Sequence, residues 1–404
     1  MILDLMLSQL TEKGDYLASD NRLYYLSPEN RSLVLERVFG RYRGLGIVDT
    51  LLMNERITEL MINGPDNIFV EIDGRVKRLD ERFCDDKDCT EEERKQRGRV
   101  QLRRIIHRIV EICGRDINEA NPIVDARLKD GSRVNVVLNP IALGGDTVTI
   151  RKFSKKPMSV EKLIEYKSIT QDIADILKTL VFAKYNIFIS GGTGSGKTTF
   201  LNALSNFIPQ DERVITIEDS AELRITGVDN LVSLETKAAN AEGKGAISIK
   251  DLIKSSLRMR PERIVVGEVR GEEALDMLQA MNTGHDGSLS TGHANSAKDM
   301  LTRLETMVLQ GSSGLPLDAV RRQIGSALDI IVHLSRMRDH SRKVVEITEV
   351  LGYEKGEIIL NPLYVFEEDP ALTRPDKVVG SLNRTKNPMR GFEKLRQAGI
   401  MDDI

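Results

Sequence analysis

The chain of 404 residues contains no tryptophan, and aromatic residues make up only 4% of it. Proteins that bind single-stranded nucleic acid without sequence preference stack bases on aromatic side chains, so this scarcity argues against such a surface. The net charge is −3, which gives the chain as a whole no attraction to nucleic acid or to an anionic membrane. We therefore expect no direct nucleic-acid partner.

Cysteine is also scarce, and the three residues Cys84, Cys89 and Cys113 suit a reducing compartment better than a disulfide framework. Together with His107 they supply the atom types of a zinc site. His107 and Cys113, however, lie six positions apart on one expected helix and therefore point in different directions. We expect free thiols.

Long apolar runs are missing as well. No segment approaches the roughly eighteen apolar residues that span a bilayer, and the first residues lack the pattern of a signal peptide. These absences predict a cytoplasmic location.

Turn signals and hydrophobic periodicity divide the chain into successive parts. The first is mostly helical in pattern. The second combines short β runs, turns at NGPD and DG, and one charged helix, which together predict a small α/β domain with an antiparallel sheet. The boundaries are 1–55 for the helical segment, 56–153 for the small domain, 154–160 for a linker, 161–366 for a larger α/β domain and 367–404 for a tail.

Within the larger domain, helices and strands alternate. Strands are expected at 186–190, 213–217, 263–266 and 288–291, and this alternation predicts a parallel sheet covered on both faces. From about 329 to 366 the pattern returns to consecutive strands, which indicates an antiparallel extension. The tail carries seven basic and two acidic residues between 374 and 396 and is predicted to be loosely ordered.

The most specific motif is SGGTGSGKTT at 190–199, which has four glycines in six positions. It fits the phosphate-binding pattern G-x-x-x-x-G-K-[ST], and it lies between an expected strand and an expected helix. Bare backbone N–H groups and the positive end of the helix attract phosphate oxygens, a lysine reaches the outer phosphates and a hydroxyl faces Mg²⁺. The expected ATP-binding residues are Gly191, Gly192, Thr193, Gly194, Ser195, Gly196, Lys197, Thr198 and Thr199.

Hydrolysis also requires carboxylates near the phosphates. Glu218 and Asp219 follow the strand RVITI, and Glu268 follows the strand RIVV. Because ligands bind at the carboxyl ends of the strands in an open parallel sheet, both glutamates are expected to face the nucleotide. Acidic residues also end strands simply because loops are solvated, but two such positions beside one phosphate loop favour a site.

Two histidines, His285 and His293, flank the short small-residue strand in GHDGSLSTGHAN. A single histidine is more often structural. Here the pair follows the Glu268 segment, so we expect both to contact the nucleotide. Phosphoryl transfer depends mainly on positioning and charge compensation, which favours sensing of the γ-phosphate over general-base catalysis.

The order GGTGSGKTT, RVITIEDSAELR, RIVVGEVRG and GHDGSLSTGHAN resembles the secretion ATPases of type II and type IV systems. Those families carry a Walker A loop, an acidic box, a Walker B strand and a histidine box in this order. The stretches ITELMINGPDNIFVE and DARLKDGSRVN resemble the CpaF-like branch, which powers tight-adherence pilus assembly. The resemblance covers about residues 50–366.

This resemblance implies a RecA-like ATPase domain with a parallel sheet, preceded by a small PAS-like α/β domain. It further implies a homo-hexameric ring that works from the cytoplasmic face of the membrane, as a peripheral protein, on an integral membrane platform protein. In the family the small domain contributes arginines to the nucleotide, and these correspond to Arg127 and Arg133, with Arg151 less firmly placed. Movement of the small domain would then couple ATP hydrolysis to work.

One departure from the common Walker B pattern is Gly267, which stands where an aspartate usually precedes the glutamate. The resembling family shares it. We assign activation of water to Glu218 and positioning of Mg²⁺ or of water to Glu268, with Thr198 as a further Mg²⁺ ligand. Two alternatives stay open: a conjugative type IV secretion or nucleic-acid translocating ATPase, and a nucleotide-gated scaffold with little turnover.

Overall fold

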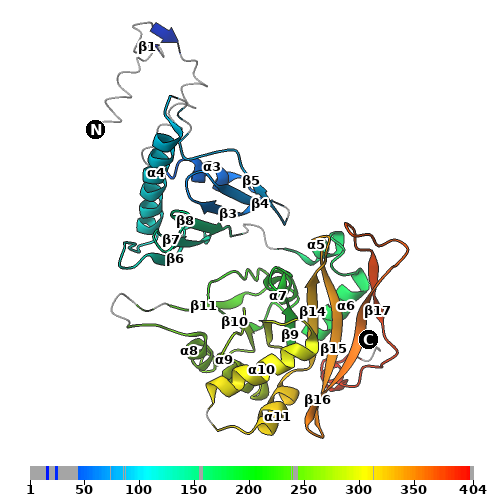
Figure 1. Ribbon diagram of the computed structural model, residues 1–404. Helices are drawn as coiled ribbons and strands as arrows, with labels where there is room; N and C mark the ends of the chain where they lie inside the picture. The colour runs from blue at the N-terminus through cyan, green and yellow to red at the C-terminus, as the bar shows by residue number, and fades with distance from the viewer. Residues whose placement is uncertain are drawn as a thin grey trace. The chain divides into compact units, whose positions relative to one another are not determined.

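The computed structural model describes residues 15–17, 23–25, 44–72, 74–84, 86, 88–153, 158–237, 239, 244–312 and 314–400. The chain forms two compact units, residues 1–154 and residues 155–404 (Figure 1). The division falls inside the stretch that the sequence suggests as a linker.

The first unit contains a six-stranded antiparallel sheet with one long helix, α4 (Glu91–Ile112), against it (Figure 1). Alternating residues of the central strands, such as Leu60, Ile150 and Val134, are buried with the apolar side of α4. Thr90 caps the start of the helix, and its side chain and that of Glu93 form a reciprocal capping box. The strand order is β5 (Arg75–Arg78), β4 (Ile68–Ile72), β3 (Ile57–Asn63), β8 (Thr147–Arg151), β7 (Arg133–Val137) and β6 (Ile123–Arg127).

The N-terminal segment differs from the expected helical pattern. Two short strands, β1 (Asp15–Leu17) and β2 (Leu23–Tyr25), pair in antiparallel fashion, and a short helix, α3 (Ile47–Met53), follows. The backbone pairing of β1 with β2 corrects the prediction of a mostly helical segment at these residues. The helix expected over 27–42 lies outside the described residues.

The second unit is an α/β structure around a nine-stranded mixed sheet, which confirms the predicted fold class. Six neighbouring strands run parallel, and three antiparallel strands extend one side. The sheet order is β11 (Asn230–Glu235), β10 (Arg213–Glu218), β12 (Arg263–Val266), β13 (Leu289–His293), β9 (Ile187–Gly191), β14 (Ile330–Arg336), β15 (Arg342–Glu354), β16 (Glu357–Glu368) and β17 (Gly380–Arg384).

Helices bury apolar side chains on both faces of this sheet. Successive residues of β9 serve opposite faces: Ile187 and Ile189 join one core, and Phe188 joins the other. A strand buried on both sides reads as a continuous apolar run, which is what the sequence shows here. The core on one face includes residues of α5 (Val160–Glu165), α6 (Gln171–Phe182) and α7 (Lys197–Ser205). The core on the other face includes residues of α8 (Ile249–Ser256), α9 (Glu273–Asn282), α10 (Ala297–Gly311) and α11 (Leu317–Ala327).

The C-terminal segment is folded, so the prediction of a loosely ordered tail over 367–404 is wrong for its described part. Strand β17 joins the sheet, and the short helix α12 (Glu393–Gln397) places Leu395 in the core at 1% exposure. The ammonium group of Lys394 lies 2.7 Å from a carboxylate oxygen of Asp286 and 2.6 Å from one of Asp329. Buried apolar residues and these ion pairs explain why the C-terminal segment is folded, which its charge composition alone did not indicate.

None of the helices in the described part of the chain is long and apolar enough to cross a membrane.

Candidate active site

The glycine-rich loop connects β9 to α7, as the motif predicts. Gly194 and Gly196 have φ values of 72° and 92°, a region that favours glycine. A side chain at Gly191 would lie 2.6 Å from the Ser195 hydroxyl, so the turn also requires glycine there because of space. The Ser195 hydroxyl donates to the Gly192 carbonyl at 2.9 Å, which closes the loop on itself.

The loop leads directly into the first turn of α7, which carries Lys197, Thr198 and Thr199. A helix N-terminus presents N–H groups and a positive dipole end to an anion. Thr193 is exposed at the outer side of the loop and Thr198 is half-buried. These features fit a nucleotide triphosphate and agree with the sequence motif.

Lys197 is 6% exposed, and its ammonium group donates to the Gly192 carbonyl at 3.0 Å. It also lies 3.1 Å from His293 Nδ1. Burial lowers the pKa of Lys197 to about 8, an effect that Glu268 opposes and that the nearby Arg270 guanidinium reinforces. An arriving phosphate would favour the charged lysine.

His293 ends β13 and lies beside the loop, because its partner in the parallel pairing is Gly191. Its Nε2 atom lies 2.8 Å from a carboxylate oxygen of Glu268. Burial lowers the pKa of His293, Glu268 raises it, and the cations Lys197 and Arg270 lower it further. A neutral ring that accepts from Lys197 at Nδ1 carries its proton on Nε2, the ring nitrogen nearer to Glu268.

Arg270 extends this chain of polar contacts to the acidic segment after β10. Its guanidinium lies 2.6 Å from the second carboxylate oxygen of Glu268 and 3.5 Å from a carboxylate oxygen of Asp219. Lys197, His293, Glu268, Arg270 and Asp219 therefore form one continuous cluster at the carboxyl ends of four parallel strands. The hydrogen bond to Glu268 raises the pKa of Arg270, an effect that burial opposes and that the charges of Glu268 and Asp219 reinforce.

Glu218 is 3% exposed and is held by the backbone. Its carboxylate accepts hydrogen bonds from the amides of Glu222 at 2.9 Å and Leu223 at 3.1 Å. A side chain at Gly267 would come within 2.9 Å of Glu218 Cγ. The absent Walker B aspartate thus has a steric explanation: Glu218, from the neighbouring strand, occupies the space that a side chain at position 267 needs.

The groups expected to hold Mg²⁺ are Thr198 and Glu268. Among the described residues, no three histidine, cysteine, aspartate or glutamate side chains converge as a metal site made by protein alone. Magnesium in nucleotide sites is held by one or two protein oxygens together with phosphates and water. A hydroxyl and a carboxylate at the loop fit that sparse donor set.

His285 does not belong to this cluster, so the prediction that it contacts the nucleotide is wrong. It precedes β13, whereas His293 ends it, and the two ends of a strand lie at opposite edges of a sheet. Its Nδ1 atom lies 3.2 Å from the Ala280 carbonyl, and its own carbonyl accepts a hydrogen bond from the Ser288 hydroxyl. His285 is a structural residue of the turn before β13.

The three expected arginines lie side by side in the first unit. Arg127 pairs with Arg133 between β6 and β7, and Arg133 pairs with Arg151 between β7 and β8. Glu59 continues the row on β3. Residues paired directly across an antiparallel sheet share a face, so the three guanidinium groups form one basic row.

Sequence reasoning missed other residues that shape the site. Arg270 has a local signal, since it follows Glu268 by two positions in the same loop. Arg342 has none: its Nε atom donates to the Gly194 carbonyl at 2.9 Å across 148 positions of the chain. Its contact depends on the antiparallel extension of the sheet.

Known proteins are similar to this chain in sequence and in fold. A family model described as "Type II/IV secretion system protein" matches residues 42–367. A Mycobacterium tuberculosis protein with a provisional name as a conjugal transfer protein is 33% identical over 321 residues, which are 78% of this chain and 86% of that protein. The type IV secretion system protein PtlH of Bordetella pertussis is 36% identical over 260 residues, 58% of this chain and 77% of PtlH.

Among solved structures, the ATPase DotB of Legionella pneumophila matches with a TM-score of 0.51 at 20% identity, over 74% of this chain and 79% of that chain. This likeness concerns the fold.

Proposed function

Because this chain belongs to the type II/IV secretion system protein family and is an ATPase of that family, we propose that it is a CpaF-like ring motor that powers tight-adherence pilus assembly or related secretion. The main observation in support of this proposal is a series of side-chain contacts beside the glycine-rich loop. It links Lys197, His293 and Glu268, so the lysine proposed to reach the phosphates is joined through a histidine to the carboxylate proposed to hold Mg²⁺.

In this proposal the loop amides and the start of α7 bind the phosphates of ATP, and Lys197 reaches the outer ones. Thr198 and Glu268 hold Mg²⁺, which supplies neutralisation of phosphate charge. Glu218 orients the attacking water, since its carboxylate is fixed by two backbone amides. His293 senses the γ-phosphate, because its ring touches both Lys197 and Glu268.

The proposal assigns charge compensation to Arg127 and Arg133, with Arg151 beside them. A planar guanidinium can bind growing phosphate charge through two parallel hydrogen bonds. Closure of the first unit on the nucleotide would then couple hydrolysis to movement between the units. We propose a homo-hexamer, since closed symmetry lets each subunit's movement alter its neighbour's site, and an integral membrane platform protein as the partner at the cytoplasmic face.

The second candidate is a conjugative type IV secretion ATPase. The Mycobacterium tuberculosis relative favours it, as does a 34% identical relative from Rhizobium radiobacter named conjugal transfer protein TrbB. Stimulation of ATP hydrolysis by single-stranded DNA, falling steeply with salt, would support that candidate. A prepilin and platform genes beside this gene would support pilus assembly instead.

Phosphate release from ATP tests the catalytic assignment. We expect turnover by the wild type and none by Lys197→Ala. If the wild type turns over no faster than Lys197→Ala, the protein is a nucleotide-gated scaffold.

The two glutamates are separated by titrating Mg²⁺ at saturating ATP. Glu268→Gln should raise the Mg²⁺ concentration needed for half-maximal turnover, while Glu218→Gln should lower the maximal rate and leave that concentration unchanged. The opposite pattern would exchange their roles.

A further inference from the structure

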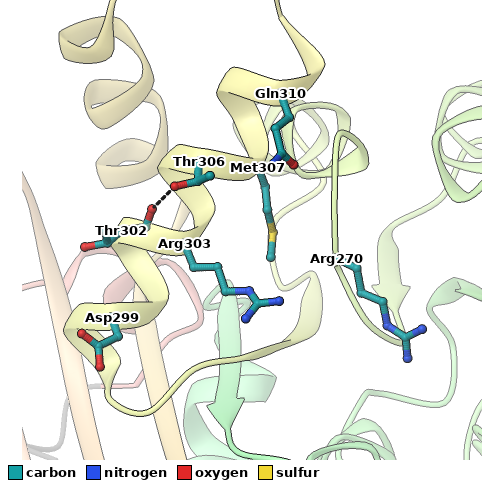
Figure 2. A pocket seen from close by; sticks show the side chains of 7 residues that line it. All are labelled: Arg270, Asp299, Thr302, Arg303, Thr306, Met307 and Gln310. Carbon is teal, nitrogen blue, oxygen red and sulfur yellow. Dashed lines mark hydrogen bonds between the residues drawn. The ribbon is translucent and has the colours of Figure 1, made fainter.

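A cavity of about 410 Å³ lies beside the carboxylate cluster, between α10 and the loop that follows β12 (Figure 2). None of the functions assigned so far uses it. Its lining is mainly polar and cationic. The residues that concern us are Arg270, Arg303, Thr302, Thr306, Gln310 and Asp299.

Two guanidinium groups reach this cavity from opposite walls. Arg303 extends from α10 toward the wall that carries Arg270 (Figure 2). Within the described part of the chain, the Arg303 side chain forms no hydrogen bond and no ion pair. The one acidic residue of the lining, Asp299, points away from both guanidinium groups in Figure 2. Among the described residues, the charge of Arg303 therefore has no ion-pair partner, whereas Arg270 is paired with Glu268 and Asp219 outside the lining.

The cavity adjoins the nucleotide site through Arg270. That guanidinium lines the cavity and also lies 2.6 Å from Glu268. Arg303 acts on the same site at longer range, since its charge helps to lower the pKa of both Lys197 and His293. A side chain that is 56% exposed, like Arg270, has room to turn from one anionic partner to another.

We propose that this cavity receives inorganic phosphate after hydrolysis, with Arg270 and Arg303 as its ligands. Inorganic phosphate carries between one and two negative charges at neutral pH and accepts bidentate hydrogen bonds from guanidinium groups. Arg270 leaves Glu268 and accompanies the phosphate away from Lys197. The hydroxyls and the amide of the α10 wall supply further donors. The inference rests on ATP hydrolysis as the source of phosphate.

The test measures binding of inorganic phosphate to the full chain by calorimetric titration at constant ionic strength. A saturating non-hydrolysable ATP analogue fills the loop, so phosphate can bind only elsewhere. The variants are Arg303→Gln and, as a control, Lys298→Gln, which removes one positive charge from the exposed side of the same helix outside the cavity. Thermal melting of each variant checks that it is folded.

We expect the analogue-loaded wild type to bind one phosphate per chain. Arg303→Gln should weaken that binding about ten- to hundred-fold, the effect of one hydrogen bond between charged groups, and Lys298→Gln should leave it within about two-fold. The proposal is overturned if the analogue abolishes phosphate binding, if both variants behave alike, or if Arg303→Gln weakens the analogue itself. The phosphate titration requires no ATP turnover, so a protein that binds ATP without hydrolysing it would still bind phosphate in this assay. Failure of the phosphate-site proposal can therefore be distinguished from failure of the proposed ATPase function.

Discussion

The packing of Glu218 against Gly267 leads to a sharp prediction for Gly267→Ala. The new Cβ atom would lie 2.9 Å from Glu218 Cγ and 3.5 Å from its Cβ, and real Cβ atoms are essentially never found closer than 3.0 Å to another heavy atom. Glu218 is 3% exposed and cannot move into solvent without leaving its two amide donors. Overpacking of this kind costs about 1–3 kcal/mol.

We therefore expect Gly267→Ala to lower the free energy of unfolding by about 1–3 kcal/mol in urea titrations. ATP turnover should fall to the level expected of Glu218→Gln, because the carboxylate that we propose orients the attacking water would be displaced. Gly227→Ala is the matched control, since a Cβ there would meet only the Asn206 carbonyl, at an ordinary 3.7 Å.

A double-mutant cycle identifies the source of the cost. In a Glu218→Ala background the clash is gone, so Gly267→Ala should cost close to nothing there. Additive losses of stability, or wild-type turnover in Gly267→Ala, would refute the steric account of the missing aspartate.

Three further predictions concern the loop, the basic row and the C-terminal segment. At pH 8, binding of a non-hydrolysable ATP analogue should take up part of a proton per site, because burial lowers the pKa of Lys197 to about 8 and bound phosphate raises that pKa. Calorimetry in buffers of different ionisation enthalpy measures this proton uptake. The Lys197→Arg variant should show no uptake. Arg133→Ala should abolish turnover and leave analogue affinity nearly unchanged, whereas equal loss of both would indicate a folding role. Lys394→Met should lower the free energy of unfolding at pH 7 by about 1–3 kcal/mol, because it leaves Asp329 and Asp286 without their cation; adding Asp329→Asn should recover most of that loss in urea titrations.

The parts of the second unit that follow from local sequence were predictable. The glycine-rich loop lies between an apolar strand and an amphipathic helix, and its chemistry depends on consecutive residues only. Strands β9, β10 and β12 contain short apolar runs that are buried on both faces, and such runs are recognisable in the sequence; β13 is a buried strand of mostly small residues. The edge strand β11 was missed, because it is half-exposed and its pattern NLVSLE carries no buried run.

The errors arise where one segment has to be placed against a distant one. The order of the C-terminal segment depends on contacts such as Lys394 with Asp286, which are 108 positions apart. The error at His285 was avoidable from sequence. A five-residue strand separates it from His293, and only one end of a strand can face the phosphates.

The surroundings of the two glutamates bear on the roles proposed for them. Each follows a parallel strand, so spacing gives no reason to prefer either. In the structure, the Glu218 carboxylate accepts hydrogen bonds from two backbone amides, and Glu218 leaves no room for a side chain at Gly267. Glu268 instead lies between His293 and Arg270, whose side chains can titrate or turn. A rigid carboxylate suits the orientation of water, whereas one with adjustable partners suits a group that has to respond when a phosphate arrives and leaves.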